Sequence, residues 1–180
     1  MSDPKSVEVL SFWFEDHAKD WFAKNPGFDA AVRSRFIALH EAAAVGHLSH
    51  WADEARSCLA LVIVLDQFPR NMFRGDARAF SSDSPALAAA GSMIEREFDR
   101  LLSPVERTFA YLPFEHAEDL AAQRRSLALF QALDPEYIES ARRHHEIIAR
   151  FGRFPHRNAM LGRESTAEEI EFLEEPGSSF

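Results

Sequence analysis

Apolar side chains recur every three to four residues along most of this chain, the spacing that places them on one face of an α-helix. The clearest segment spans residues 29 to 45, ends before Gly46, and has a predicted buried face made of Val32, Phe36, Leu39 and Ala43. An earlier segment starts with a predicted cap at Asp3 followed by Pro4, and its apolar face is Val7, Leu10 and Phe14. The pattern predicts helices from the start of the chain.

Proline marks further helix starts, because its fixed backbone angle suits the first helical turn. A capping residue precedes proline at Asp83 or Ser84 with Pro85, at Ser103 with Pro104, and at Asp134 with Pro135. We expect Pro113 to end the helix that starts after Ser103 and to begin another. Residues 165 to 168 have the spacing of a capping box before a last helix.

The apolar run at residues 58 to 65 is rich in β-branched residues and is compatible with either a buried strand or a buried helix. No second run resembles it, and a lone strand would leave its backbone groups unpaired. We therefore predict a buried helix that is capped by Asp53 and ends near Phe68, since Pro69 cannot continue the hydrogen-bond ladder.

The fold class predicted from these segments is all-α. The chain has no Asn-Gly hairpin, no alternating strand pattern and no Gly-Ser linker, and its 180 residues suit a single domain over residues 1–180. About eight short helices favour antiparallel helix pairs in a solenoid-like array, with a four-helix bundle as the alternative.

Composition narrows the class of protein. A hydrophobic fraction of 46% with 16 Phe argues against disorder, and the single cysteine, Cys58, lies in the apolar run and is expected in the core. No apolar segment approaches the roughly 20 residues of a membrane span, and the first residues lack a signal-peptide pattern, so we expect a soluble cytoplasmic protein. A net charge of -9 argues against nucleic-acid binding.

The charge is unevenly distributed near the end of the chain. Residues 142 to 163 hold six arginines and one acid, Glu146, whereas residues 164 to 175 hold six glutamates and no base. Two interpretations stay open: the blocks neutralise each other across a helix contact, or the arginines form a patch that binds an anion.

Two distant segments share a Phe-Pro pattern, which we call the Phe-Pro corners. One spans residues 67 to 71 and is followed by Gly75, and the other spans residues 153 to 158 and is followed by Gly162. In each we predict that Phe68 or Phe154 is buried, that proline starts one turn, and that glycine closes it in a left-handed conformation. Rigidly placed Arg and Asn side chains would suit a carboxylate or phosphate, but they are also the groups that satisfy helix ends.

Histidines and acids supply a second kind of candidate chemistry. Glu115, His116, Glu118 and Asp119 are expected at a helix start, where they act as caps or where His116 forms an acid–base pair with a carboxylate. His144 falls on an apolar helix face and is expected in the core. Although the chain has eight His, no metal-binding spacing and no nucleotide motif occur, so we expect neither a metal nor a cofactor.

Four segments resemble the signature segments of a widespread bacterial family known only as domain of unknown function nine-two-four. They are residues 12–14, 65–71, 112–119 and 151–166, and the most specific is Phe-Pro-His-Arg-Asn at 154–158. This chain has Ala117 where the related motif more often has Ser, so no hydroxyl group lies there. The resemblance implies a tetratricopeptide-like α-α superhelix and brings no substrate or catalytic residue.

Two functional hypotheses follow from different classes. The first is a helical-repeat binding module for a small anion or an acidic peptide group, in which the two Phe-Pro corners meet and Arg70 or Asn71 lies near Arg157 or Asn158. The second is an enzyme in which a His/carboxylate pair transfers a proton. The candidate ligand-binding residues are Asp66, Gln67, Arg70, Asn71, His116, Glu118, His144, Arg153, His156, Arg157 and Asn158, of which Asp66, His116, Glu118, His144 and His156 are the acid–base candidates.

Overall fold

The computed structural model describes residues 3–133 and 137–179, and every regular element in these ranges is helical, which confirms the predicted all-α class. The α-helices, in chain order, are α1 (Pro4–Leu10), α2 (Pro26–Ala44), α3 (Ala55–Val62), α4 (Phe68–Met72), α5 (Asp83–Glu95), α6 (Pro104–His116), α7 (Leu120–Leu133), α8 (Ile138–Phe151) and α9 (Ala167–Leu173). Shorter turns join them: π-helical η1 (Ser11–Asp16) and η4 (Ile63–Gln67), and 3-10 turns η2 (Ala18–Asp20), η3 (Ser49–Asp53), η5 (Ala77–Phe80), η6 (Phe98–Leu101) and η7 (Pro155–Arg157).

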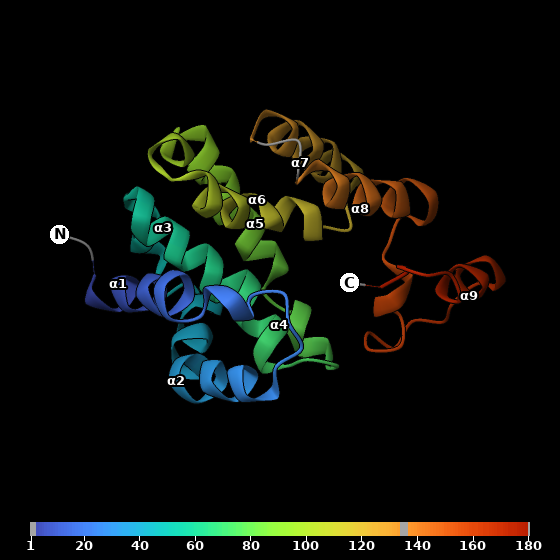
Figure 1. Cartoon of the computed structure of the whole chain (residues 1–180), viewed down its shortest axis with the longest axis horizontal. Coiled ribbons are helices and arrows are strands. Elements are labelled where there is room, and N and C mark those ends of the chain that lie inside the picture. The colour runs from blue at the N-terminus through green and yellow to red at the C-terminus, as the bar shows by residue number, and fades with distance from the viewer. Residues whose placement is uncertain (1–2, 134–136, 180) are drawn as a thin grey trace.

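The helices pack largely on their near neighbours in sequence. Helix α1 packs on α3, α3 on α5, α5 on α6, α6 on α7 and α7 on α8, while α2 packs on α4. Figure 1 shows α1 and α9 toward opposite ends of the longest axis, with α3, α5 and α6 between them. None of the helices within the described ranges is long and apolar enough to cross a membrane.

The core is built on aromatic rings from several helices. Phe68 has no exposed surface, and its ring centroid lies 4.7 Å from that of Phe36 and 5.8 Å from that of Trp13. Phe154 is also fully buried, in a smaller cluster with Ile147 and Ile148 of α8. Both Phe-Pro corners are thus anchored in apolar cores as predicted. Gly75 and Gly162 close them at φ +82° and +64°, a conformation that favours glycine.

The apolar run is a buried helix, as expected, but it does not end near Phe68. Helix α3 passes through the π-helical turn η4 directly into α4, which continues to Met72. Pro69 is the second residue of α4, directly after the wider π-helical turn, so the helix continues past it. The helix begins after Glu54, not after a cap at Asp53.

Pro113 does not break its helix, so that prediction was wrong. Helix α6 runs through Pro113 to His116, although proline has no N–H to donate to the carbonyl four residues earlier. Tyr111, Leu112 and Phe114 are buried around it, and this packing holds the last turn helical. Glu115 and His116 therefore lie at the end of a helix, not at the start of one.

Other predicted boundaries shifted or held. The α2 helix starts at Pro26 instead of residue 29, because the Asn25 side chain caps it. Helix α5 starts after Ser82. The last capping box pairs Thr166 with Glu169, one residue beyond the predicted one. The caps at Asp3 and Ser103 are confirmed. Val7, which was expected on the buried face of its helix, is 55% exposed. The predicted helix start at Asp134 and Pro135 lies outside the described residues.

Candidate functional site

A π-helical turn places an acid in the protein interior. In η4 the Phe68 N–H donates to the carbonyl of Ile63, five residues earlier, so the turn is one residue wider than an α-helical turn. Asp66 lies in this turn with no exposed surface. Such wide turns are frequent at functional sites, and here the turn carries the most deeply buried carboxylate of the predicted set.

Asp66 is held by three neighbours. Gln67 Nε2 donates to it over 2.6 Å, the Nδ1 of His116 lies 2.9 Å and 3.0 Å from its two oxygens, and Nη1 of Arg70 lies 3.2 Å away. Burial alone would raise the pKa of Asp66, but the charge of Arg70 and the hydrogen bond from His116 outweigh burial and hold this pKa well below its usual range. Asp66 is therefore ionised at neutral pH.

His116 ends α6 beside this carboxylate. Burial, and then the charge of Arg70, lower the pKa of His116, so its ring is neutral near pH 7. Because ionised Asp66 only accepts, the Nδ1 of His116 carries the ring proton and donates it. The hydrogen bonds of this ring within the described residues all use Nδ1, and the side chain keeps 16% of its surface exposed.

The two Phe-Pro corners meet at a carboxylate. Asp83, at the start of α5, accepts from Arg70 Nη1 over 2.8 Å and from Arg157 Nη1 over 3.3 Å. The Arg157 guanidinium also lies between two aromatic rings, 4.5 Å from the centroids of both Phe80 and Phe154. The predicted approach of Arg70 and Arg157 is therefore present, with Asp83 as the bridge.

The two arginines are incompletely paired. Nη2 of Arg70 and Nε of Arg157 are buried and find no hydrogen-bond partner in the described part of the chain. Burial, and next the neighbouring charge of Arg70, lower the pKa of Arg157 to about 10. Buried donors are normally satisfied, so this pair has unused capacity for an acceptor.

A second buried acid lies behind His116. Glu115 is 2% exposed, and its carboxyl group accepts from Ser140 Oγ over 2.7 Å and lies 3.1 Å from Nδ1 of His144. Burial raises the pKa of Glu115 to about 7, even though the hydrogen bond from Ser140 lowers it. Burial also lowers the pKa of His144 to about 3, so this histidine is a neutral core residue, as expected.

The second Phe-Pro corner is mainly structural beyond Arg157. Arg153 donates twice to Glu169, over 2.6 Å and 2.7 Å, and Arg163 donates twice to Glu118, over 2.6 Å and 2.9 Å. The side chain of Asn158 donates to Ser165 and Glu169 and accepts from Arg163. These contacts join the segment after α8 to α9 and to the loop before α7.

Two further predicted residues stand near this arrangement. Asn71, in α4, donates to Asp29 of α2 over 2.9 Å and so joins these two helices. The ring of His156 packs beside Phe154, and burial lowers its pKa to about 4. Of the predicted site residues, the structure brings Asp66, Gln67, Arg70, His116, His144, His156 and Arg157 around one polar cluster, and places Asn71, Glu118, Arg153 and Asn158 in structural contacts.

The two charge blocks neutralise each other only in part. Arg150 pairs with Glu168 over 2.8 Å, and Arg153 pairs with Glu169, as the first interpretation requires. Arg157 and Arg163 instead pair with acids outside the glutamate block. Contact between the blocks therefore accounts for some of these arginines and not for others.

Sequence reasoning missed Asp83 as a member of the site. Its position before Pro85 suggested only a helix cap, and nothing in the local pattern says that two arginines 87 residues apart meet there. Phe80, which covers Arg157, was missed for the same reason. Such partners are fixed by tertiary packing and carry no local signal.

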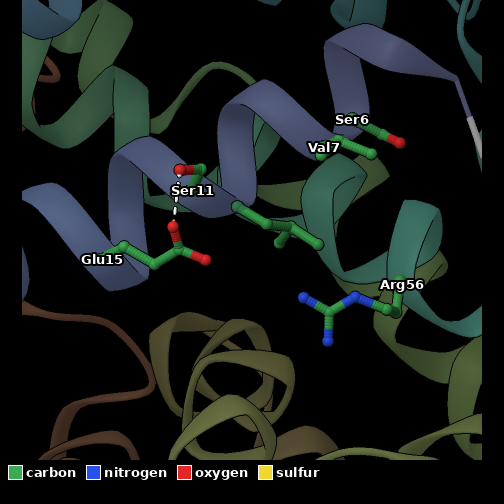
Figure 2. A pocket seen from close by; sticks show the side chains of 6 residues that line it. Ser6, Val7, Ser11, Glu15 and Arg56 are labelled. Carbon is green, nitrogen blue, oxygen red and sulfur yellow. Dashed lines mark hydrogen bonds between the residues drawn. The ribbon is translucent and has the colours of Figure 1, made fainter.

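Two surface hollows of the protein lie away from this cluster. Within residues 3–133 and 137–179, no group of three or more His, Cys, Asp or Glu could hold a metal ion. One hollow, of about 70 Å³, is lined by residues of α1, η1 and α3. Figure 2 shows Ser11, which donates to Glu15, and Arg56 on the facing side. A wider hollow of about 500 Å³ adjoins Asp3 and Trp51. We take the polar cluster as the candidate site because two of its buried N–H groups, on Arg70 and Arg157, have no partner in the described part of the chain.

Comparisons with known proteins agree with this fold. The model of a family described as bacterial protein of unknown function, DUF924, matches residues 9–177. The solved structure of a protein of unknown function from Agrobacterium tumefaciens is 45% identical in sequence and superposes with a TM-score of 0.91, covering 94% of this chain and 97% of that one. A comparison with curated proteins gives no match. The chain belongs to the DUF924 family of bacterial proteins of unknown function, as its signature segments implied.

Proposed function

We propose that this protein binds a small anion, a carboxylate or a phosphate, between Arg70 and Arg157. The observation that carries the proposal is that partly exposed Arg70 and buried Arg157 share Asp83, while each keeps one buried N–H without a partner among the described residues. An anion bound here would supply an acceptor for donors that lack one, and planar guanidinium groups match the geometry of carboxylate and phosphate.

The arginines are held in place before a ligand arrives. Arg157 is fixed between the rings of Phe80 and Phe154, and Arg70 is fixed by its bond to the backbone oxygen of Asp66, 2.7 Å long. Fixed donors lose little conformational entropy on binding. This arrangement favours recognition over a purely structural ion pair.

Solvent reaches the edge of the cluster. The side chains of Arg70, Asp83 and His116 keep 19%, 21% and 16% of their surface exposed. A small anion would approach along this edge, where His116 and Arg70 come together at Asp66. The site proposed here is thus narrower than the Arg/Asn corner expected from the sequence, because Arg153 and Asn158 already have partners.

The test is an anion-dependent thermal shift. Melting temperature is measured with phosphate, sulfate and succinate against chloride at equal ionic strength, since a ligand at 100 times its Kd stabilises the native state by about 2.7 kcal/mol. The same measurement is made with a short acidic peptide. A rise in melting temperature with the peptide but not with the free anions would identify a peptide carboxylate as the ligand. We expect a concentration-dependent rise, with loss of this rise in Arg157→Gln.

Asp83→Asn sharpens this test. Removing the shared carboxylate should lower the melting temperature without ligand and enlarge the increment that phosphate gives, because the anion takes the place of the lost charge. The matched control is Arg150→Gln, an arginine of α8 that pairs with exposed Glu168 and should leave the increment unchanged. If Asp83→Asn lowers the melting temperature and phosphate raises it in neither protein, the arginines have a structural role only and the proposal fails.

A further inference from the structure

We propose that His116 is a general base in this site, with its Nε2 atom directed at the bound anion or at a water molecule beside it, and with Asp66 as its positioning residue. The inference rests on the proposed anion site, because that site would bring a substrate to the ring. It goes further by assigning proton transfer to this protein.

The geometry of the Asp66–His116 pair fixes the tautomer of the ring. Both carboxylate oxygens of Asp66 lie within 3.0 Å of Nδ1, so the ring orientation is set from one side. Gln67 and Arg70 in turn hold the carboxylate, which lies in the π-helical turn. A buried carboxylate that accepts from Nδ1 favours the tautomer in which Nε2 has a free lone pair, as a general base requires.

The charges around the ring also suit proton transfer. Neutral His116 can accept a proton, and the buried negative charge of Asp66 would stabilise the imidazolium ion that forms. In the resting protein the positive charge of Arg70 disfavours the imidazolium ion, and an anion bound to Arg70 would neutralise part of that positive charge. Binding of the anion should therefore make His116 a stronger base when a substrate is present.

The buried histidines of the core differ from His116. His40 and His144 have their Nδ1 atoms 3.1 Å and 2.9 Å from backbone oxygens of Val64 and Ser140. His144 also has a carboxyl neighbour, Glu115, 3.1 Å from its Nδ1, but its side chain is only 6% exposed, whereas that of His116 is 16% exposed. His116 therefore combines a fully buried, ionised carboxylate partner with partial access to solvent.

Proton transfer to His116 leaves a balanced set of bonds and charges. An O–H or activated C–H bond of the substrate, or an O–H bond of water, breaks and leaves its electron pair on oxygen or carbon. The proton forms a new bond to Nε2 of His116, and the resulting positive charge is paired with Asp66. The substrate class is a small organic acid or phosphate ester whose anionic group lies on Arg70 and Arg157 and whose transferable proton faces His116.

The experiment measures acylation of each histidine by diethyl pyrocarbonate, which reacts with the lone pair of neutral imidazole, and reads it by peptide mass spectrometry. The chain contains its own references: His47 is exposed and should react fast, whereas buried His40 should stay unmodified. We expect His116, whose side chain is 16% exposed, to react more slowly than His47 but clearly faster than His40. In Asp66→Asn its rate should fall a further three- to tenfold, about, because loss of the negative charge weakens the base.

Phosphate supplies the second arm. If the anion site exists, phosphate should slow the acylation of His116 and leave that of His47 unchanged. If His116 reacts and phosphate does not slow the reaction, the anion site is contradicted, whereas the accessibility of Nε2 that a general base requires is supported. No reaction of His116 in the wild-type protein, matching His40, overturns the general-base inference whether or not phosphate raises the melting temperature. The comparison of His116 with His47 and His40 in the wild-type protein tests the inference even if the Asp66→Asn variant does not fold.

Discussion

Replacement of Glu115 by Gln should make the protein progressively more stable than the wild type as pH rises. Glu115 is 2% exposed, and burial raises its pKa from 4.5 to about 7. The protonated acid is therefore favoured in the folded state. The benefit is fully present below the unfolded pKa of 4.5 and is lost as pH rises through about 7.

The magnitude follows from the size of this shift. Each pKa unit corresponds to about 1.4 kcal/mol, so ionisation of buried Glu115 should cost the wild type about 3 kcal/mol between pH 4.5 and pH 8. The glutamine side chain of the Glu115→Gln variant keeps an oxygen that can accept from Ser140, and it never ionises. The groups that face this position are Ser140 and His144 from α8 and the charge of Asp66 from η4, and all are the same in both proteins.

The assay is urea unfolding of both proteins at several pH values between 5 and 8. If the free energies of unfolding of the two proteins differ by the same amount at every pH, the difference reports only the altered hydrogen bonds. A difference that grows with pH reports the cost of the buried charge. The control is Glu139→Gln on α8, whose side chain is 66% exposed and should show no comparable growth. If the Glu115→Gln difference does not grow with pH, the burial argument is refuted.

Stability should respond to three further changes. Truncation of fully buried Phe68 or Phe154 to Ala should each cost about 3 to 5 kcal/mol in denaturant unfolding, and an unchanged midpoint would mean that the ring is not a core anchor. Arg153→Gln should lower the melting temperature through lost bonds to Glu169 and leave the phosphate increment intact, whereas loss of that increment would place Arg153 in the site. Burial lowers the pKa of His144 to about 3, so the stability that neutral His144 contributes is lost as pH falls from 6.5 toward 3. Between pH 7 and pH 4 the free energy of unfolding of His144→Gln should therefore fall by about 3 kcal/mol less than that of the wild type. An equal fall in both proteins would contradict this.

Periodicity and capping residues were sufficient to predict the helical class and most elements. The caps at Asp3 and Ser103, and burial of Phe68 and Phe154, follow from local rules that the structure obeys. Pro113 breaks such a rule, because buried neighbours outweigh one missing hydrogen bond. Predictions from local patterns were thus correct where neighbours within one or two helical turns determine the conformation of a residue.

The site was only partly predictable. The sequence indicated Arg70, His116 and Arg157, since their types and their neighbours are chemically suggestive. It could not indicate that Asp83 joins two of them, or that the π-helical turn carries Asp66 inward. Partner choice among several acids depends on distances between helices, which no local spacing encodes.

The bridge through Asp83 has a consequence for local unfolding. Arg157 belongs to the segment after α8, while Arg70 and Asp83 belong to the earlier helices, so detachment of this segment removes one side of the polar cluster. Opening of residues 152–173 and loss of the cluster are thus thermodynamically linked. Any ligand held by both arginines should slow amide hydrogen exchange in this C-terminal segment, well beyond the residues that it touches.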